Sequence, residues 1–266
     1  MSVISLTTDF GIKDGNVGVM KGVIWSISPE ARIADLSHMI QPQNIREAAL
    51  ILARSAPYFP EQAIHVVVVD PGVGTARRPM AARIGTQFYV GPDNGTITML
   101  LEKAQQAGWA CEFVQLSNPD YWLRDVSFVF HGRDIFSPVA AHLSLGVPFK
   151  SLGTAFDDPV RLELPMPQKT ASGWQGEVIH IDHFGNVASN IMVANLAEML
   201  KEKEKITVQA GDVAIEGLVN TFGEGAVGEL IALMGSTGNL ILSVVNGSAA
   251  ERLGIKVGDP VEALVG

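Results

Sequence analysis

Carboxylate, guanidinium, imidazole and amide side chains gather at five points where apolar stretches of the sequence end. Such groups can accept hydrogen bonds from sugar hydroxyls, bind charged substrate groups, and orient or deprotonate a water molecule. The five clusters are Asp9-Phe10-Gly11, Asp70 to Arg78, Asp93-Asn94-Gly95, Phe130 to Asp134, and Asp182 to Asn186. Each cluster alone also fits an ordinary turn, because Asp, Asn, Pro and Gly are common turn residues. Their shared position at the ends of apolar runs favours a ligand site.

Metal ligation and disulfide bonding are not expected. The six histidines contain no HxH or HExxH spacing, which zinc sites often use. Cys111 is the only cysteine, so neither an intrachain disulfide nor a four-cysteine zinc site can form. We therefore expect chemistry carried by carboxylate, guanidinium and imidazole groups, without a metal.

Strands and helices alternate in the first 160 residues. The apolar runs predict strands at 2–8, 32–36, 64–69 and 87–90, and helical spacing predicts helices at 14–28, 44–56 and 96–107. Asn44 is a suitable N-cap for the second helix. Four consecutive valines at 66–69 suit a strand that is buried on both faces. This alternation predicts a layered α/β domain, in which ligands bind beyond the carboxyl ends of the strands.

The sequence changes character after about residue 160. A stretch rich in proline and small polar residues predicts a linker at about 165–173. Beyond it, short strands are predicted at 176–181, 205–209, 229–233 and 239–245, with one helical excursion around 193–203. We therefore expect an N-terminal α/β domain at 1–164 and a small C-terminal domain at 174–266 that resembles a β-barrel.

The net charge of the chain indicates which kinds of partner it can bind. The formal net charge of -9 over 266 residues disfavours binding to nucleic acid and suits a small-molecule substrate. No run of about 18 apolar residues predicts a membrane span, and no basic segment followed by an apolar run predicts a secretory signal. The cytoplasm is the expected location.

Seven phrases in fixed order carry a resemblance to a known family. They are Leu6-Thr7-Thr8-Asp9-Phe10-Gly11, Asp35-Leu36-Ser37-His38, Pro42-Gln43-Asn44-Ile45, Val69-Asp70-Pro71-Gly72-Val73-Gly74-Thr75, Gly91-Pro92-Asp93-Asn94-Gly95, Phe130-His131-Gly132-Arg133-Asp134-Ile135-Phe136 and Ile181-Asp182-His183-Phe184-Gly185-Asn186. The set resembles the S-adenosylmethionine hydroxide adenosyltransferase family, whose relatives include fluorinase and chlorinase. The resemblance extends to about residue 250 and implies an N-terminal α/β domain followed by a C-terminal β-barrel.

The resemblance also implies site residues and an assembly. The family's hydrolases carry a catalytic Asp, Arg and His, which correspond here to Asp70, Arg77 and His131. The corresponding substrate-binding residues are Asp9 for the ribose hydroxyls, Asp14, Asn16, Asp182 and Ser236 for the methionine end, Asn186 with Asn246 and Ser248 for adenine, and Asn94. Members of the family are typically homotrimers that hold S-adenosylmethionine, as substrate rather than cofactor, between subunits.

Two alternatives to water-driven cleavage at C5′ stay open. The first is an adenosyl halide synthase, which the Asp70 carboxylate disfavours because it repels halide. The second is a binding protein without turnover, which would need none of Asp70, Arg77 and His131. Val129 departs from the threonine that the family's hydrolases often carry before Phe-His-Gly, so one hydrogen bond to sugar or water is either missing or supplied by Ser127 or by backbone. The sequence leaves open whether Asp70 or His131 accepts the proton of the water.

Overall fold

The computed structural model describes residues 2–201 and 206–265 and divides into two compact units. Unit 1 is Met1–Leu162 and unit 2 is Glu163–Gly266. Strand β8 (Gln168–Lys169) lies inside the segment expected to be a linker and pairs with β9 (Gly173–Ile181). This part of the expected linker therefore belongs to the sheet of unit 2.

Unit 1 is built on a seven-stranded mixed sheet with the order β2-β1-β3-β5-β4-β6-β7. Its strands are β1 (Val3–Thr8), β2 (Arg32–Ser37), β3 (Ile64–Val68), β4 (Pro79–Ile84), β5 (Gln87–Pro92), β6 (Cys111–Leu116) and β7 (Gly153–Phe156). β2, β1, β3 and β5 are parallel, whereas β4 runs antiparallel to both of its neighbours. The four predicted strands are confirmed, and β4, β6 and β7 were not predicted.

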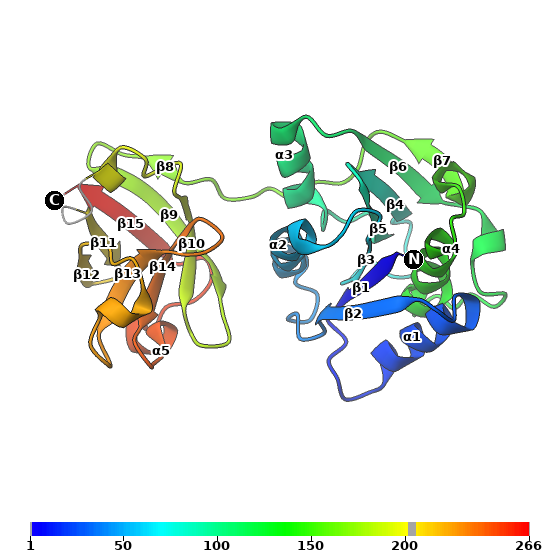
Figure 1. Cartoon of the computed structure of the whole chain (residues 1–266), viewed down its shortest axis with the longest axis horizontal. Helices are drawn as coiled ribbons and strands as arrows, with labels where there is room; N and C mark the ends of the chain where they lie inside the picture. The colour runs from blue at the N-terminus through cyan, green and yellow to red at the C-terminus, as the bar shows by residue number, and fades with distance from the viewer. Residues whose placement is uncertain (1, 202–205, 266) are drawn as a thin grey trace. The chain divides into compact units, whose positions relative to one another are not determined.

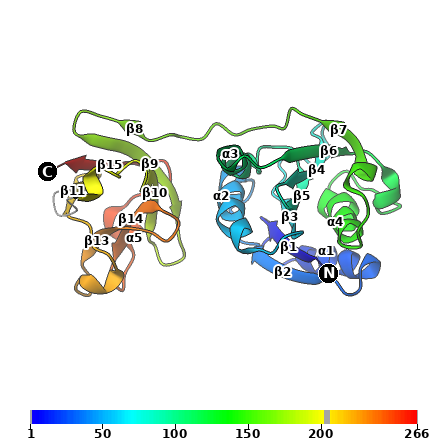
Figure 2. The same ribbon diagram turned by 45° about the horizontal axis from the view of Figure 1, so that its top comes forward.

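Helices cover both faces of this sheet (Figures 1 and 2). They are α1 (Asn16–Ile27), α2 (Ile45–Ser55), α3 (Thr98–Ala107) and α4 (Ser137–Ser144). Met20 of α1 and Val139 of α4 share one apolar cluster, and Leu52 of α2 and Leu101 of α3 share another. All five residues of β3 are buried because the strand lies between these two layers. The predicted layered α/β fold is thus confirmed.

Helix α2 shows how local sequence fixes an element of this fold. The side chain of Asn44 accepts a hydrogen bond from the backbone N–H of Glu47 at 3.0 Å, which satisfies one of the free donors of the first turn. The predicted N-cap is therefore confirmed.

Unit 2 is a sheet that curls toward a barrel, with the order β12-β11-β15-β9-β10-β14-β13 and β8 beside β9. The remaining strands are β10 (Val187–Met192), β11 (Ile206–Ala210), β12 (Val213–Glu216), β13 (Leu230–Met234), β14 (Asn239–Val244) and β15 (Pro260–Val265). A bridge between Val219 and Leu233 ties the chain after β12 to β13, so the two ends of the sheet approach each other. The expected barrel-like domain is confirmed.

Short helical segments complete the two units. They are α5 (Ala249–Leu253), the turns Ala56–Tyr58, Pro119–Tyr121, Phe149–Leu152 and Phe222–Glu224, and a π-helix at Gly132–Phe136. The helix predicted around 193–203 consists of turns followed by one helical turn at 199–201, and its last two residues lie outside the described part. Within residues 2–201 and 206–265, every helix is too short or too polar to cross a membrane.

Candidate active site

The polar clusters of unit 1 meet at one edge of its sheet. Asp9 follows β1, Asp70 follows β3 and Asn94 follows β5, and the carboxyl ends of parallel strands share an edge. Arg77 stands just before β4 and comes to the same edge because β4 runs the other way. The reversed strand therefore brings a cation to the place where the carboxylates gather.

Asp70, Arg77 and His131 are in direct contact. Nε of Arg77 donates to Oδ1 of Asp70 at 2.9 Å, and Nη2 of Arg77 donates to Oδ2. The same Nη2 lies 2.8 Å from Nδ1 of His131, 54 positions along the chain. Only 10% of the Arg77 side chain and 5% of the Asp70 side chain are exposed, so the pair is well shielded from water. Such a two-pronged contact fixes the orientation of the carboxylate.

The environment of His131 keeps its ring neutral. Burial lowers the pKa of His131 from its usual value, and the charge of Arg77 lowers it further, while Asp70 and Asp134 oppose this shift. A guanidinium is always protonated and can only donate. Nδ1 must therefore accept from Arg77, and the single proton of the neutral ring lies on Nε2.

Close packing of the next residue places His131. Gly132 opens a π-helix, and an added Cβ there would lie 3.3 Å from Sδ of Met20 and 3.3 Å from Cγ1 of Val68. The Oγ of Ser137 donates to the carbonyl of Gly132 at 2.7 Å and so satisfies a carbonyl of this irregular turn. The ring of Phe136 lies under the guanidinium of Arg77, 5.4 Å from Cζ to the ring centroid. Glycine at position 132 thus lets the turn that follows His131 pack closely against the end of β3 and the side of α1.

Asp9 lies at the same edge but outside these contacts. Its Oδ2 accepts from the backbone N–H of Gln43 at 2.8 Å, and the side chain is only partly buried. Gln43 has a φ of 68°, so its N–H is presented by a left-handed turn. Phe10 packs edge-on against Phe130, with centroids 5.6 Å apart. This aromatic contact joins the Asp9 segment to the segment that carries His131.

Asn94 acts on the backbone beside Asp70. Its Nδ2 donates to the carbonyl of Val69 at 2.8 Å, and its Oδ1 accepts from Oγ1 of Thr96 at 2.6 Å. The amide therefore holds the residue that precedes Asp70. Asp14 is exposed and Asn16 is the first residue of α1, and the structure shows no direct contact between either and Asp70.

Arg78 has a different task from its neighbour Arg77. Nε of Arg78 donates to Oδ2 of Asp93 at 2.9 Å, and Nη1 donates to Oδ1 of Asp158 at 2.6 Å. Asp93 in turn accepts from the backbone N–H of Val160 at 2.8 Å. Arg78 therefore anchors the end of unit 1, and Arg77 is the arginine that contacts Asp70.

The hydroxyl of Ser127 is engaged within the protein. Its Oγ donates to Oδ2 of Asp134 at 2.8 Å, while Val129 is 78% exposed. The sequence suggested Ser127 as a substitute for a missing threonine hydroxyl, but its proton is directed at Asp134. Sequence reasoning did not assign a role to Asp134, although a charged residue inside the apolar run around it was a signal.

In unit 2, Asp182 and Asn186 hold the turn between β9 and β10. Asp182 accepts from the backbone N–H groups of Phe184 and Asn186 at 2.9 Å and from Nδ2 of Asn186 at 2.8 Å. Oδ1 of Asn186 accepts from Oγ of Ser243 at 2.6 Å. The two predicted binding side chains thus bind each other, and their roles toward methionine and adenine stay predictions.

The other predicted binding residues of unit 2 lie at two ends of β14. Ser248 caps α5 by accepting from the N–H of Glu251 at 3.1 Å, and it packs so closely on Gly185 that a Cβ there would clash. Asn246 precedes it with a φ of 56°. Ser236 is exposed in the turn before β14, at the opposite end of this six-residue strand. The structure therefore brings Ser248 close to the Asp182 turn and leaves Ser236 apart from it.

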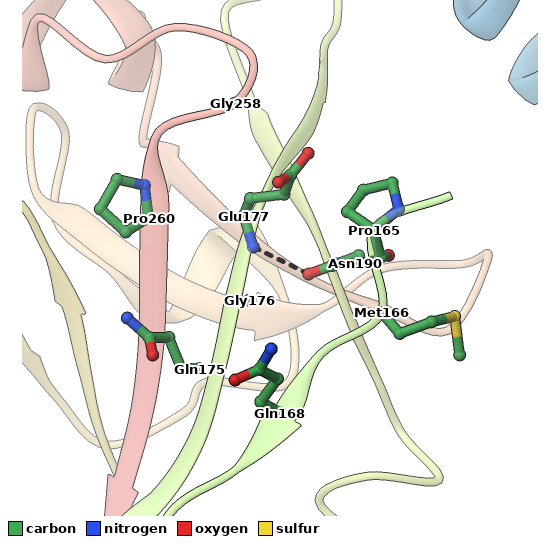
Figure 3. Close-up of a pocket in the computed structure, with 9 residues that line it drawn as sticks. All are labelled: Pro165, Met166, Gln168, Gln175, Gly176, Glu177, Asn190, Gly258 and Pro260. Atoms are coloured by element: carbon green, nitrogen blue, oxygen red, sulfur yellow. Dashed lines mark hydrogen bonds between the residues drawn. The ribbon is translucent and has the colours of Figure 1, made fainter. Parts of the chain in front are cut away.

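Unit 2 also has a pocket beside β9 and β10, shown in Figure 3. Asn190 spans it, accepting from the N–H of Glu177 at 2.8 Å and donating to the carbonyl of Pro165 at 2.9 Å. None of the predicted site residues lines this pocket. Among the residues that the structure describes, no group of three or more His, Cys, Asp or Glu side chains could hold a metal ion.

The fold and the site define an α/β enzyme whose carboxylate, guanidinium and imidazole groups meet at the edge of a mixed sheet. The family model for the SAM hydroxide adenosyltransferase N-terminal domain matches residues 4–153, and the model for the C-terminal domain matches residues 176–262. The chain belongs to the SAM hydroxide adenosyltransferase family.

Individual relatives agree with this family. The (R)-S-adenosyl-L-methionine hydrolase of Salinispora tropica is 41% identical, over 99% of this chain and 98% of its own. The protein of the same name from Thermus thermophilus is 38% identical, over 99% of this chain and 100% of its own. A crystal structure of a conserved protein from Thermotoga maritima is similar with a TM-score of 0.92 and 35% identity, over 98% and 99% of the two chains. Fluorinase of Nocardia brasiliensis is more distant, at 29% identity over 99% of this chain and 97% of its own.

Proposed function

We propose that this protein hydrolyses S-adenosyl-L-methionine to adenosine and L-methionine. The observation that carries the proposal is the contact of Asp70, Arg77 and His131 at the sheet edge, since these groups suit the handling of a water molecule. The names of the relatives at 38% and 41% identity support the same reaction. S-adenosyl-L-methionine is the substrate, and the proposed reaction uses no further cofactor and no metal.

In this reaction water attacks C5′ of the ribose in line with the C5′–S bond. The new C–O bond forms while the C–S bond breaks, its electron pair returns to sulfur, and one proton is released. The sulfonium is already a good leaving group, so alignment of water and substrate is the main task of the protein. Effective alignment can contribute about 7–11 kcal/mol to lowering the barrier.

Within this proposal, Asp70 rather than His131 accepts the proton of the water. The lone pair of Nδ1 of His131 is engaged by Arg77, and Nε2 already carries the proton of the neutral ring. The ring therefore has no lone pair available unless its contact with Arg77 breaks. Each carboxylate oxygen of Asp70 keeps acceptor capacity beyond its bond to Arg77.

The binding roles and the assembly are parts of the same proposal. Asp9 would accept from the ribose hydroxyls, for which a carboxylate is well suited. We also propose a homotrimer in which residues of unit 2, such as Asn186, complete a site with a neighbouring subunit, and a cytoplasmic location without nucleic-acid or membrane partners. The sequence resemblance supports the binding roles and the trimer, while the net charge of -9 disfavours nucleic-acid partners.

Incubation with S-adenosyl-L-methionine in ¹⁸O-water, with and without chloride, tests the proposed reaction. We expect adenosine that carries ¹⁸O at its 5′ oxygen, unlabelled methionine, and the same products when chloride is present. Chloroadenosine would instead indicate an adenosyl halide synthase. Bound but unchanged substrate would indicate a binding protein, and either result would refute the proposal.

A further inference from the structure

The segment 123–131 that leads to His131 has little apolar anchorage at its tip. Phe128 is 80% exposed and Val129 is 78% exposed, so their side chains do not hold the segment in place. The backbone of this segment nevertheless lies against the loop between Asp70 and Arg77. Gly74 in that loop has a φ of 76°, and an added Cβ would clash with the carbonyl of Phe128. Phe130 anchors the end of the segment against Phe10, so another contact must hold its tip.

Asp134 supplies this contact from inside the protein. Its side chain is completely buried. Oδ2 accepts from both the backbone N–H and the Oγ of Ser127 at 2.8 Å, and Oδ1 accepts from Nε of Arg133 at 2.5 Å. The carbonyl of Asp134 accepts from the N–H of Leu123 at 2.9 Å. The beginning and the middle of the segment are therefore both attached to this residue.

A closed ring of hydrogen bonds joins Ser127, Phe130 and Asp134. Oγ of Ser127 accepts from the N–H of Phe130 at 3.1 Å, and the carbonyl of Phe130 accepts from the N–H of Asp134 at 3.1 Å. The chain between Ser127 and Asp134 thus returns on itself, with His131 inside the ring. A buried carboxylate with charged and neutral donors forms strong hydrogen bonds.

We propose that Asp134 and Ser127 are positioning residues for the reaction, because they hold the segment that sets His131 against Arg77. This inference rests on the proposed hydrolysis, although neither residue is expected to touch substrate. Loss of the ring lets the segment move from the Asp70–Arg77 loop and changes the placement of the imidazole. A displacement of about 1 Å at a reacting centre can lower a rate roughly 100-fold.

Ser127→Ala is the central variant because it removes only the hydroxyl and leaves the backbone bond to Asp134. We expect kcat to fall roughly 10- to 100-fold, with KM changed less than about threefold. Ser127→Thr keeps the hydroxyl and should restore most of the rate. Asp134→Asn is the second variant. In either orientation of the amide, its NH₂ group faces Ser127 or Arg133, both of which donate to Asp134 in the wild type.

Ser144→Ala is the matched control. Ser144 lies in α4, where its Oγ donates to the carbonyl of Ala141 at 2.7 Å and lies 3.0 Å from Oγ of Ser28, so its removal costs comparable hydrogen bonds away from the site. Its kcat should equal that of the wild type at a temperature where both are folded. A rise in KM of Ser127→Ala with unchanged kcat would indicate that Ser127 binds substrate, and would overturn the proposal.

The titration of His131, followed by NMR, is the readout that does not depend on turnover. The charged groups that face this ring are Arg77, Asp70 and Asp134, and the backbone of Ser127 also forms a hydrogen bond with it. In the wild type the titration midpoint should lie below 6.5. In Ser127→Ala it should move upward, because the ring loses burial and its contact with Arg77. An unchanged titration in a folded variant would refute the positioning role. If the wild type forms no adenosine, the proposed hydrolysis is refuted. The NMR titration then still decides whether Ser127 and Asp134 position His131.

Discussion

Nη2 of Arg77 lies 2.8 Å from Nδ1 of His131 while also binding Asp70. Protonation of His131 would place a second donor against the guanidinium and break this contact. The neutral ring is therefore the form that fits the site.

Activity should consequently persist in mildly acid solution. Burial and Arg77 lower the pKa of His131 below 6.5, so the ring stays neutral until the pH falls below that lowered value. We expect kcat/KM to decline with a midpoint below pH 6.5. In Arg77→Gln the NMR titration midpoint should rise, because one of the causes of the shift is removed. A wild-type midpoint above 6.5 would contradict this reading of the site.

Asp70→Asn should affect turnover far more than binding. The change keeps the shape of the side chain but removes the proton acceptor, and such groups typically contribute about 10²- to 10⁴-fold to a rate. Affinity for S-adenosyl-L-methionine, measured by calorimetry, should stay within about an order of magnitude. The exposed Asp212→Asn is a charge-matched control. Near wild-type turnover of Asp70→Asn would mean that Asp70 does not receive the proton.

Asp9→Ala should weaken binding of the ribose. Loss of a charged hydrogen-bond partner costs about 1.5–3 kcal/mol per bond, which raises Kd roughly 10- to 150-fold. Asp9 also binds the N–H of Gln43, so loosening of that loop must be separated from loss of ribose contact. The comparison is adenosine against 2′,3′-dideoxyadenosine. The wild type should prefer adenosine, and the variant should bind both equally; a retained preference would remove Asp9 from the ribose site.

The stability of unit 1 should depend on pH through His65. This histidine is 1% exposed, its Nδ1 lies 2.6 Å from Oγ of Ser5, and burial lowers its pKa to about 4. The unfolded chain takes up the proton near pH 6.5 and the folded chain only near 4. This contribution, about 3 kcal/mol, is therefore complete above 6.5 and is lost as the pH falls to 4.

His65→Leu should flatten this part of the profile of unfolding free energy against pH, measured with urea. The exposed His183→Gln is the matched control and should keep the wild-type slope. Equal slopes in all three proteins would show that His65 is protonated in the folded state.

Mixed oligomers test the proposed sharing of sites. Subunits with Asp70→Asn and subunits with Asn186→Ala should each form inactive homo-oligomers. After co-expression, roughly a quarter of the sites would combine two intact halves by random assortment, so activity should partly return. A monomeric mass in solution, or no recovery in demonstrably mixed oligomers, would exclude a shared site.

Sequence patterns correctly predicted those parts of the fold in which the local preferences of the residues agree with their tertiary packing. The valines of β3 and the capping residue Asn44 are examples, since burial on two faces and a free helix end have direct local signals. β4 has no such signal, because Pro79 and Arg83 interrupt a short apolar run and nothing local announces its reversed direction. The helical pattern near 193–203 yielded turns, because local propensity does not decide tertiary packing.

Only part of the site could be predicted from the sequence. The motifs placed Asp70 and Arg77 near each other in sequence, but their contact with His131 depends on chain folding over 54 positions. The mutual bonds of Asp182 and Asn186 were also invisible, since a motif does not show which donors a side chain meets. The hydrogen bonds that join Asp134 to Ser127 and Phe130 could not be predicted from residue spacing alone.

Arg77 and Arg78 are adjacent, yet one reaches Asp70 and the other reaches Asp93 and Asp158. Adjacent side chains of an extended chain point to opposite sides, so which arginine reaches Asp70 depends on how many residues separate the pair from β4. With β4 held in register, a single residue inserted between Arg78 and Pro79 would move Arg78 to the place that Arg77 holds and would move Arg77 away from Asp70. Insertions and deletions at this junction should therefore be rare during evolution.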